Sequence, residues 1–346
     1  MGIFSKIFGK KNQLGVDFGT SFLKIVELKK EGEKSRLENY ALVDLASLHK
    51  DSLNIQESEL IETLKQALSE AKIETRQANV SVPLSSSFST IITVPFMSDK
   101  ELADAISFEA RQYIPSSAGE VSLDWIELSR DEIEKKIQVL LMAVPVETVN
   151  KYSRIAEGAG LELKSLEIES FSMMRSLVGE AFTGICCAVE IGYRSTNIVV
   201  IDKGRVVISH YYEAGGSEFS HTLKQSLNIN EDRAEALKRN IGLAGLKEEK
   251  EISSLMYLLI DKILGEIQRT LNAYYKKYNR KVEKIILAGG TANMKGLVEY
   301  FNSQLGIETV LANSFLHIDY PPMLKPAIEE LNPILSVAVG LALKEL

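Results

Sequence analysis

The sequence has very little cysteine. Only Cys186 and Cys187 occur among 346 residues, and they are adjacent. Adjacent cysteines fit neither the ligand spacing of a zinc site nor an ordinary disulfide framework, which excludes folds that depend on either. Because both residues lie in an apolar run, we expect them to pack inside a strand, as free cysteines usually do in a reducing compartment.

The sequence also lacks long apolar runs and an excess of positive charge. No apolar stretch reaches the roughly 18–20 residues that cross a bilayer. The net charge of -7 argues against a large nucleic-acid-binding face, which would have to be basic. What is present is a globular balance of 45% hydrophobic and 25% charged residues, over a length that suggests about two domains. We therefore expect a cytoplasmic protein without a nucleic-acid partner.

Residues 1–12 form a short basic and apolar segment. The segment is too short for a signal peptide and has no cleavage site. Its position 6 is Lys6, where a myristoylation motif requires Ser or Thr. The segment is interpreted as a frayed terminus or, alternatively, as a weak membrane-interface anchor or a segment that binds a partner.

An internal repeat organises the rest of the chain. Val16–Val26 aligns without a gap to Val189–Val199, at an offset of 173 residues. The acidic residue and the glycine of the turn match in the two copies, Asp17 with Glu190 and Gly19 with Gly192. Each copy has an apolar strand, an acidic residue, a glycine turn with hydroxyl side chains and a second strand. The repeat predicts two similar α/β domains that face each other.

The stretch 85–160 has the pattern of a separate β-α-β-β-α module. Ser98, with Glu101 three residues later, forms a capping box that begins its first helix. Trp125, the only tryptophan, is expected to fill the module's core. The predicted division is 1–12 as the terminal segment, 13–84 plus 161–184 as the first domain, 85–160 as an inserted module, and 185–346 as the second domain. Within the second domain, about 217–280 should form a helical subdomain that binds nucleotide.

The repeated turns carry the groups that bind a triphosphate with magnesium. Such a ligand requires closely approaching backbone N–H groups, hydroxyls, a lysine and carboxylates that reach the metal through water. The first copy supplies Asp17, Gly19, Thr20, Ser21 and Lys24, and the second supplies Glu190, Gly192, Ser195, Thr196 and Asn197. Two further glycine turns follow later strands, at Gly215-Gly216 and Gly289-Gly290. We expect ATP and Mg²⁺ between the two halves, with Asp17 and Glu190 as the metal carboxylates.

The order of these motifs resembles the actin–hexokinase–Hsp70 superfamily. Val16–Ser21 is similar to its first phosphate motif and Val189–Gly192 to its second. Ile286–Leu297, which includes Thr291 and Met294, is similar to the adenosine motif. Ala234–Arg239 resembles the helix whose Glu and Lys flank the ribose and adenine, which implies those roles for Glu235 and Lys238. The resemblance implies an actin-like fold, a duplicated α/β, ribonuclease-H-like architecture with two domains.

The inserted module selects a branch of this superfamily. Val94–Leu102, followed by Phe108–Pro115, is similar to the PilM family of pilus-assembly proteins, as are Phe8–Asp17 and Ala338–Leu343. The resemblance implies an ATP-binding scaffold of type IV pilus assembly, peripheral to the inner face of the inner membrane. It also implies that the cytoplasmic tail of a PilN-like membrane protein docks between the module and the first domain. Other pilus assembly proteins are implied as further partners. The alternatives are a small-molecule kinase and an FtsA-like filament former, and self-association stays open.

Two positions bear on hydrolysis. The second phosphate motif usually has Asp, and the longer Glu190 moves the carboxylate outward by about one bond length. Glu169 follows the strand that leaves the module, where the superfamily can place a Glu or Gln that orients the attacking water. The alternative for Glu169 is a charge at a helix N-terminus. We expect ATP binding with at most slow hydrolysis.

Overall fold

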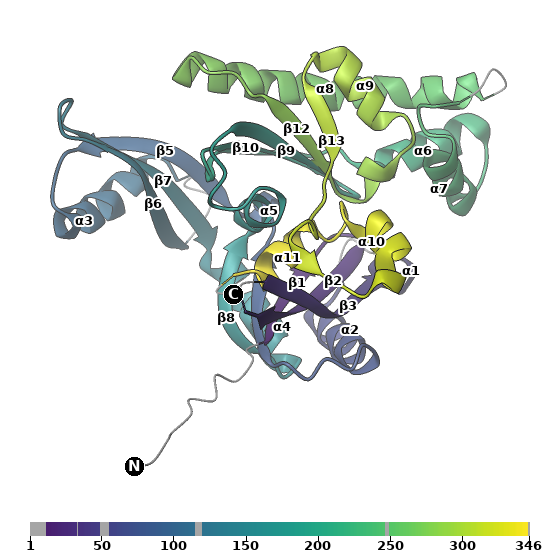
Figure 1. Cartoon of the computed structure of the whole chain (residues 1–346), viewed down its shortest axis with the longest axis horizontal. Helices are drawn as coiled ribbons and strands as arrows, with labels where there is room; N and C mark the ends of the chain where they lie inside the picture. The colour runs from purple at the N-terminus through teal and green to yellow at the C-terminus, as the bar shows by residue number, and fades with distance from the viewer. Residues whose placement is uncertain (1–11, 33, 49–54, 115–119, 246–248, 345–346) are drawn as a thin grey trace, which may run out of the picture.

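The computed structural model describes residues 12–32, 34–48, 55–114, 120–245 and 249–344, and these form three β-sheets with helices packed around them (Figure 1). Of the predicted N-terminal segment 1–12, residues 1–11 lie outside the described residues, and Asn12 is the first residue of β1. Among the described residues, no helix combines the length and the apolar character that crossing a membrane requires.

The first sheet carries the first copy of the repeat. Across the sheet, its strands are β14 (Ile318–Asp319), β3 (Lys34–Asp44), β2 (Phe22–Glu31), β1 (Asn12–Phe18), β4 (Gln77–Val82) and β8 (Glu162–Ile168). Helices α2 (Glu57–Glu70) and α4 (Val146–Gly158) pack on one face, where Val16 is buried. Helix α11 (Ser336–Ala342) packs on the other face, against Gly15. Neighbouring residues of β1 thus serve opposite faces, as the two-residue period of a strand requires.

The second sheet repeats this arrangement strand for strand. Its order is β11 (Arg205–Tyr212), β10 (Thr196–Asp202), β9 (Ile185–Ile191), β12 (Lys284–Ala288) and β13 (Glu308–Leu311), which corresponds to β3-β2-β1-β4-β8. The turns also match, because Gly19 N–H donates to the Phe22 carbonyl at 3.0 Å and Gly192 N–H donates to the Ser195 carbonyl at 2.8 Å. The predicted duplication is therefore confirmed at the level of the backbone.

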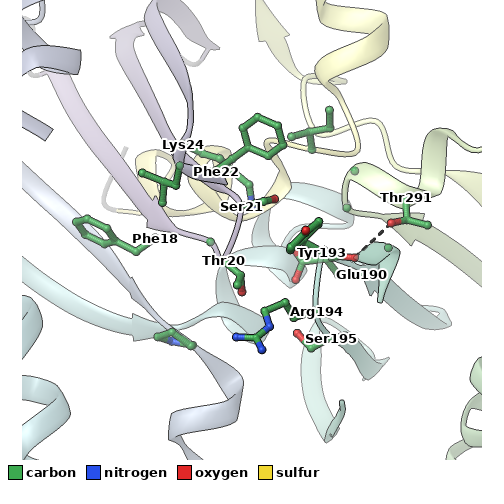
Figure 2. A pocket seen from close by; sticks show the side chains of 18 of the residues that line it. Phe18, Thr20, Ser21, Phe22, Lys24, Glu190, Tyr193, Arg194, Ser195 and Thr291 are labelled. Atoms are coloured by element: carbon green, nitrogen blue, oxygen red, sulfur yellow. Dashed lines mark hydrogen bonds between the residues drawn. The ribbon is translucent and has the colours of Figure 1, made fainter. Parts of the chain in front are cut away.

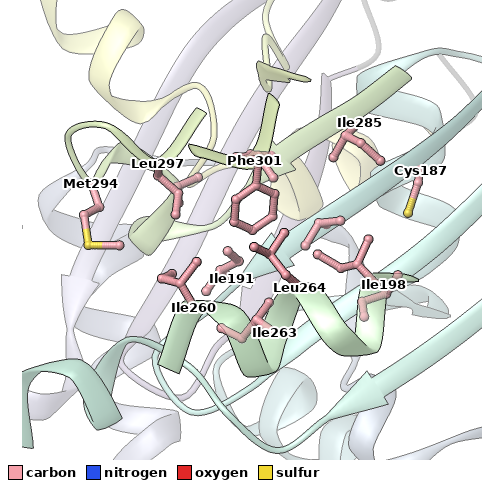
Figure 3. Packing of buried hydrophobic residues seen from close by; sticks show 14 of the residues in the cluster. Cys187, Ile191, Ile198, Ile260, Ile263, Leu264, Ile285, Met294, Leu297 and Phe301 are labelled. Atoms are coloured by element: carbon pink, nitrogen blue, oxygen red, sulfur yellow. The ribbon is translucent and has the colours of Figure 1, made fainter. Parts of the chain in front are cut away.

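The second sheet has a thick apolar core beneath its helices (Figure 3). Phe301 lies at its centre, packed among residues of β9, β10 and the long helix α8 (Lys250–Tyr278). The other helices on this half are α6 (Gly216–Leu227), α7 (Glu231–Asn240) and α9 (Leu297–Leu305). Cys187 is buried in this core and Cys186 in the cluster on the opposite face, which confirms that the cysteines pack inside a strand.

The third sheet belongs to the inserted module. It has the order β5 (Phe88–Pro95), β7 (Lys136–Pro145) and β6 (Val121–Asp131), with helix α3 (Asp99–Glu109) packed on one face. The predicted capping box is present, since the Glu101 carboxylate accepts from Ser98 N–H at 2.9 Å. Trp125 is half-buried against the module's core, as expected.

The module ends earlier than the sequence predicts. Helix α4, its expected last element, buries Tyr152, Ile155 and Ala156 in the core of the first sheet. Amphipathic spacing indicated that this helix has a buried face but could not say which sheet covers it. We infer that the module spans about 85–145 and that α4 belongs to the first domain.

The end of the chain also departs from the predicted division, which assigned 185–346 to the second domain. Beyond Ala312, strand β14 pairs with β3, and α10 (Lys325–Leu331) and α11 pack on the first sheet (Figure 1). Residues of α11 contribute to the cores of both halves, with Ala338 in the first and Leu341 in the second. We infer that residues 313–344 belong to the first domain and that their helix α11 connects this domain to the second. The two remaining α-helices of the described residues are α1 (Leu45–Leu48), which follows β3, and α5 (Glu169–Leu177), which follows β8.

Candidate functional site

A cavity of about 1040 Å³ lies between the two halves, and the two repeated turns border it. Thr20 and Ser21 come from the turn between β1 and β2, and Tyr193, Arg194 and Ser195 come from the equivalent turn between β9 and β10 (Figure 2). The duplication therefore brings two strand-turn-strand units from distant parts of the sequence to one space.

The first turn is backed by a buried ion pair. Asp17 and Lys24 are paired in the antiparallel register of β1 and β2, and the Lys24 Nζ–Asp17 Oδ2 distance is 2.8 Å. Ser81 Oγ donates to the other carboxylate oxygen of Asp17 at 2.8 Å. Burial alone would lower the pKa of Lys24, but Asp17 and Glu190 outweigh it, so the pKa is raised and the lysine stays charged.

The second turn has the corresponding pair in amide form. Glu190 and Asn197 occupy the same register positions in β9 and β10, and Asn197 Nδ2 donates to Glu190 Oε2 at 3.0 Å. The same amide donates to Glu169 Oε2 at 3.1 Å, and Leu84 N–H donates to that oxygen at 3.0 Å. Glu169 therefore bridges the second domain and the chain that leads into the module.

Asp17, Glu169 and Glu190 share this buried space, and their charges repel one another. Burial, with the charges of Glu190 and Asp17, raises the pKa of Glu169 to about 8. Burial also raises the pKa of Glu190, although Lys24 opposes the shift. Both groups lie in a low-dielectric setting where ionisation is costly unless positive charge is nearby.

This arrangement predicts an unusual pH dependence of stability. In the unfolded chain Glu169 titrates near 4.5, whereas in the folded protein it titrates near 8. Over this window the folded state holds a proton that the unfolded state has released, so the free energy of unfolding falls as pH rises. Thermal unfolding without metal from about pH 5 to about pH 8 should show this decline, and Glu169→Gln should reduce it. An equal decline in the variant would assign the effect to other groups.

The other end of the cavity is formed by α6 and α7. Lys238 Nζ lies 2.5 Å from Glu235 Oε2 and donates to the Gly216 carbonyl at 3.1 Å. Ser220 Oγ and Arg239 Nε also donate to Glu235, at 2.6 Å and 2.8 Å. The predicted Glu–Lys pair thus lines the cavity as a fixed network rather than as a solvated helix face.

The glycine turns of the second domain pack closely on one another, and Gly215, Gly216 and Gly289 leave no room for a Cβ. The Gly192 carbonyl accepts from Gly216 N–H at 2.8 Å and from Thr291 Oγ1 at 3.2 Å. A Cβ on Gly216 would lie 2.5 Å from Thr291 Oγ1. Gly289 has φ +86°, and its Cβ would lie 2.4 Å from the Ile191 carbonyl oxygen. Positive φ and close backbone approach explain glycine at Gly289, whereas the Thr291 hydroxyl leaves no room for a Cβ at Gly216.

Most of the site residues predicted from the sequence line this cavity. They are Gly19, Thr20, Ser21, Lys24, Glu169, Glu190, Gly192, Ser195, Asn197, Gly216, Glu235, Lys238, Gly289, Gly290, Thr291 and Met294. Three others lie behind its wall. Asp17 is buried beneath Lys24, and Thr196 donates through its hydroxyl to the Ala214 carbonyl at 2.8 Å. Gly215 packs against the turn, where a Cβ would lie 2.7 Å from Ser195 N.

Sequence reasoning missed Tyr193, Arg194 and Arg239, which also line the cavity. The repeat held the signal for the first two, because its alignment places Tyr193 and Arg194 in the turn itself. Arg239 is the last residue of Ala234–Arg239, the stretch of α7 that resembles the nucleotide-binding helix, but the resemblance assigned roles only to Glu235 and Lys238.

The described residues include no group of three or more His, Cys, Asp or Glu side chains arranged to ligate a metal. One further observation concerns the carboxylate end of the cavity. The Oδ1 atom of Asn197 is buried and has no hydrogen-bond partner among the described residues.

Comparisons with known proteins address the fold and the family. A model of the family described as type IV pilus assembly protein PilM matches residues 15–346. The structure is similar to that of the PilM–PilN type IV pilus biogenesis complex, with a TM-score of 0.83 and 25% identity over 96% of this chain and 98% of that chain. The ethanolamine utilization protein EutJ from Carboxydothermus hydrogenoformans has a TM-score of 0.59 and 21% identity, over 96% and 89% of the two chains.

Two further matches are one solved structure and one curated protein that aligns with only part of this chain. MreB 5 of Spiroplasma citri, solved with bound AMPPNP, has a TM-score of 0.54 and 13% identity, over 97% of this chain and 96% of that one. An uncharacterized protein of Methanocaldococcus jannaschii is 28% identical over 130 residues, which is 34% of this chain and 54% of that protein. The chain thus spans about half the length of this curated relative. The structural likenesses confirm the predicted actin-like ATPase fold.

Proposed function

This chain belongs to the family of type IV pilus assembly protein PilM, and we propose that it is an ATP-binding scaffold of type IV pilus assembly. In this proposal it binds ATP with Mg²⁺ between its two halves and holds a PilN-like membrane protein through its inserted module. The observation that carries the nucleotide part is the convergence of both repeated turns and the Glu235–Lys238 pair on one cavity.

The residues of the cavity fit a nucleotide and a divalent cation. Glycine backbones border it where side chains would clash, and an adenosine would lie toward Glu235 and Met294. Asp17 and Glu190 would hold Mg²⁺ through water, which that ion gives up reluctantly. The buried and unpartnered Oδ1 of Asn197 supplies a further acceptor for such a water. A bound cation would neutralise the charge on the phosphates and on the clustered carboxylates.

The partner part of the proposal rests on the module's open edge. In the three-stranded sheet, β6 lies at an edge and pairs with β7 alone among the described strands. Leu123 on this strand is 37% exposed, and β6 lies close to α4 of the first domain. An edge strand can accept an extended peptide through backbone hydrogen bonds, while exposed apolar side chains form pockets. We assign this edge to the tail of a PilN-like protein, which would place the chain at the cytoplasmic face of the inner membrane.

Removal of the module tests the assignment. Phe88 and Ala143 are paired residues of β5 and β7, so excising 88–143 leaves ends that a short Gly-Ser linker can join. The shortened protein keeps α4 in the first domain. It is expected to bind ATP with the affinity of the full chain. It should no longer bind a fluorescently labelled PilN-tail peptide, as measured by anisotropy titration. Full peptide affinity in the folded deletion variant would refute the assignment.

A matched pair of point variants narrows the test to the edge. Leu123→Glu places a charge on the proposed peptide surface and should weaken peptide binding about tenfold or more, because the carboxylate would lose water on binding. Ile133→Glu makes the same chemical change at the tip of the β6–β7 hairpin, where the side chain is 94% exposed. Peptide affinity in Ile133→Glu should equal that of the unmodified protein.

A further inference from the structure

The two repeated turns differ in charge, and the difference falls on the cavity. The alignment that pairs Gly19 with Gly192 also pairs Ser21 with Arg194. Where the first turn presents a small hydroxyl, the second presents a guanidinium. The backbone of the turn is alike in both halves, so this arginine is not needed to form it.

Arg194 has no partner among the described residues, unlike the other basic side chains that line the cavity. It is exposed, lines the cavity, and forms no ion pair or side-chain hydrogen bond with any described residue. The others have partners: Lys24 pairs with Asp17, Lys238 and Arg239 pair with Glu235, and Lys151 lies over the ring of Tyr152. An unpaired guanidinium in a cleft built from glycine turns is available to an anionic ligand.

The position of Arg194 points to one end of the ligand. In Figure 2 its side chain extends toward the side of Thr20 and away from Thr291, which borders the adenosine end. Burial and the charge of Glu213 raise the pKa of Tyr211, another lining residue, and Arg194 opposes the shift, so Arg194 lies on the side of the cavity that Tyr211 and Glu213 border. The acid Glu213 lines the cavity here too, and a phosphate would have to displace any attraction between it and Arg194.

We propose that Arg194 is a specificity-determining residue that contacts the terminal phosphate of ATP and thereby distinguishes ATP from ADP. This inference rests on the proposed nucleotide-binding function. A guanidinium can donate two parallel hydrogen bonds to phosphate oxygens, and such charge-assisted contacts are stronger than neutral ones. ADP lacks the terminal phosphate and loses this contact, whereas the turn backbones remain available to its inner phosphates.

Calorimetric titration of the full chain with MgATP and with MgADP tests the proposal. Arg194→Ala should weaken ATP binding by about tenfold to a hundredfold and ADP binding by less than about threefold. Arg194→Lys keeps the positive charge but cannot donate two parallel hydrogen bonds to one phosphate. Its ratio of ATP affinity to ADP affinity should therefore lie between those of the unmodified protein and Arg194→Ala. Arg111→Ala removes the same charge from an exposed site outside the cavity and should leave both affinities unchanged.

The outcomes separate the inference from the function on which it rests. Equal losses for ATP and ADP in Arg194→Ala would overturn the inference, because the arginine would then contact the inner phosphates or act structurally. An unchanged ratio with unchanged affinities would overturn it as well. If the unmodified protein bound neither nucleotide, the proposed function itself would fail, and the inference with it.

Discussion

Gly340→Ala is expected to lower the free energy of unfolding by about 3 kcal/mol or more, the upper end of what overpacking costs. Gly340 lies in α11, where this helix crosses α5 (Glu169–Leu177), and a Cβ would lie 1.8 Å from the Ser172 carbonyl oxygen. The clash is with backbone, so no side chain can rotate to relieve it. Since α11 contributes to the cores of both halves, moving it would disturb both. Urea unfolding followed by circular dichroism measures the loss.

Gly265→Ala provides the matched control. Gly265 lies inside α8, and a Cβ there would meet nothing within 4 Å. Alanine favours a helix interior over glycine by about 1 kcal/mol, so this variant should be slightly more stable than the unmodified protein. If Gly340→Ala were as stable as Gly265→Ala, the close contact between α5 and α11 would not be what requires glycine at position 340.

Asp17→Asn is expected to weaken magnesium-dependent ATP binding about tenfold or more, because it removes a buried charge assigned to the metal. The substitution keeps the side-chain shape and an oxygen that can accept from Ser81. It removes the charge that pairs with Lys24 and would attract the cation. Calorimetric titration with ATP, with Mg²⁺ and with EDTA, measures the change, and a thermal melt confirms that the variant is folded.

Glu27→Gln is the control for a buried carboxylate outside the cavity. Glu27 lies on β2 of the same sheet and accepts hydrogen bonds from Asn12, Asn39 and Thr75. Its loss should cost some stability but leave the effect of magnesium on ATP affinity unchanged. Should Asp17→Asn retain the full magnesium effect, Asp17 is not a metal carboxylate, and Glu190 would become the leading candidate.

The cavity residues were more predictable than their interactions. Strand, acid, glycine and hydroxyl follow one another within a few residues, so a local pattern suffices to find Asp17, Gly19 and their repeats. The partner of Lys24 was not predictable in this way, because it depends on the register of β1 against β2. Arg194 was missed although the repeat alignment places it in the second turn, because the alignment pairs it with the uncharged Ser21 and so gives no signal for its charge.

Sequence alone determined the duplication, because it depends on a short motif repeated at a fixed offset, and the resemblance of its motifs to known families indicated the actin-like class and the family. It could not decide that α4 and α11 both pack on the first sheet. A buried face records that a helix is covered but not by what, since any apolar surface of the right shape satisfies it. Tertiary structure alone decided that helix α11 returns from the second half to pack beside β1, and that the two turns border one cavity.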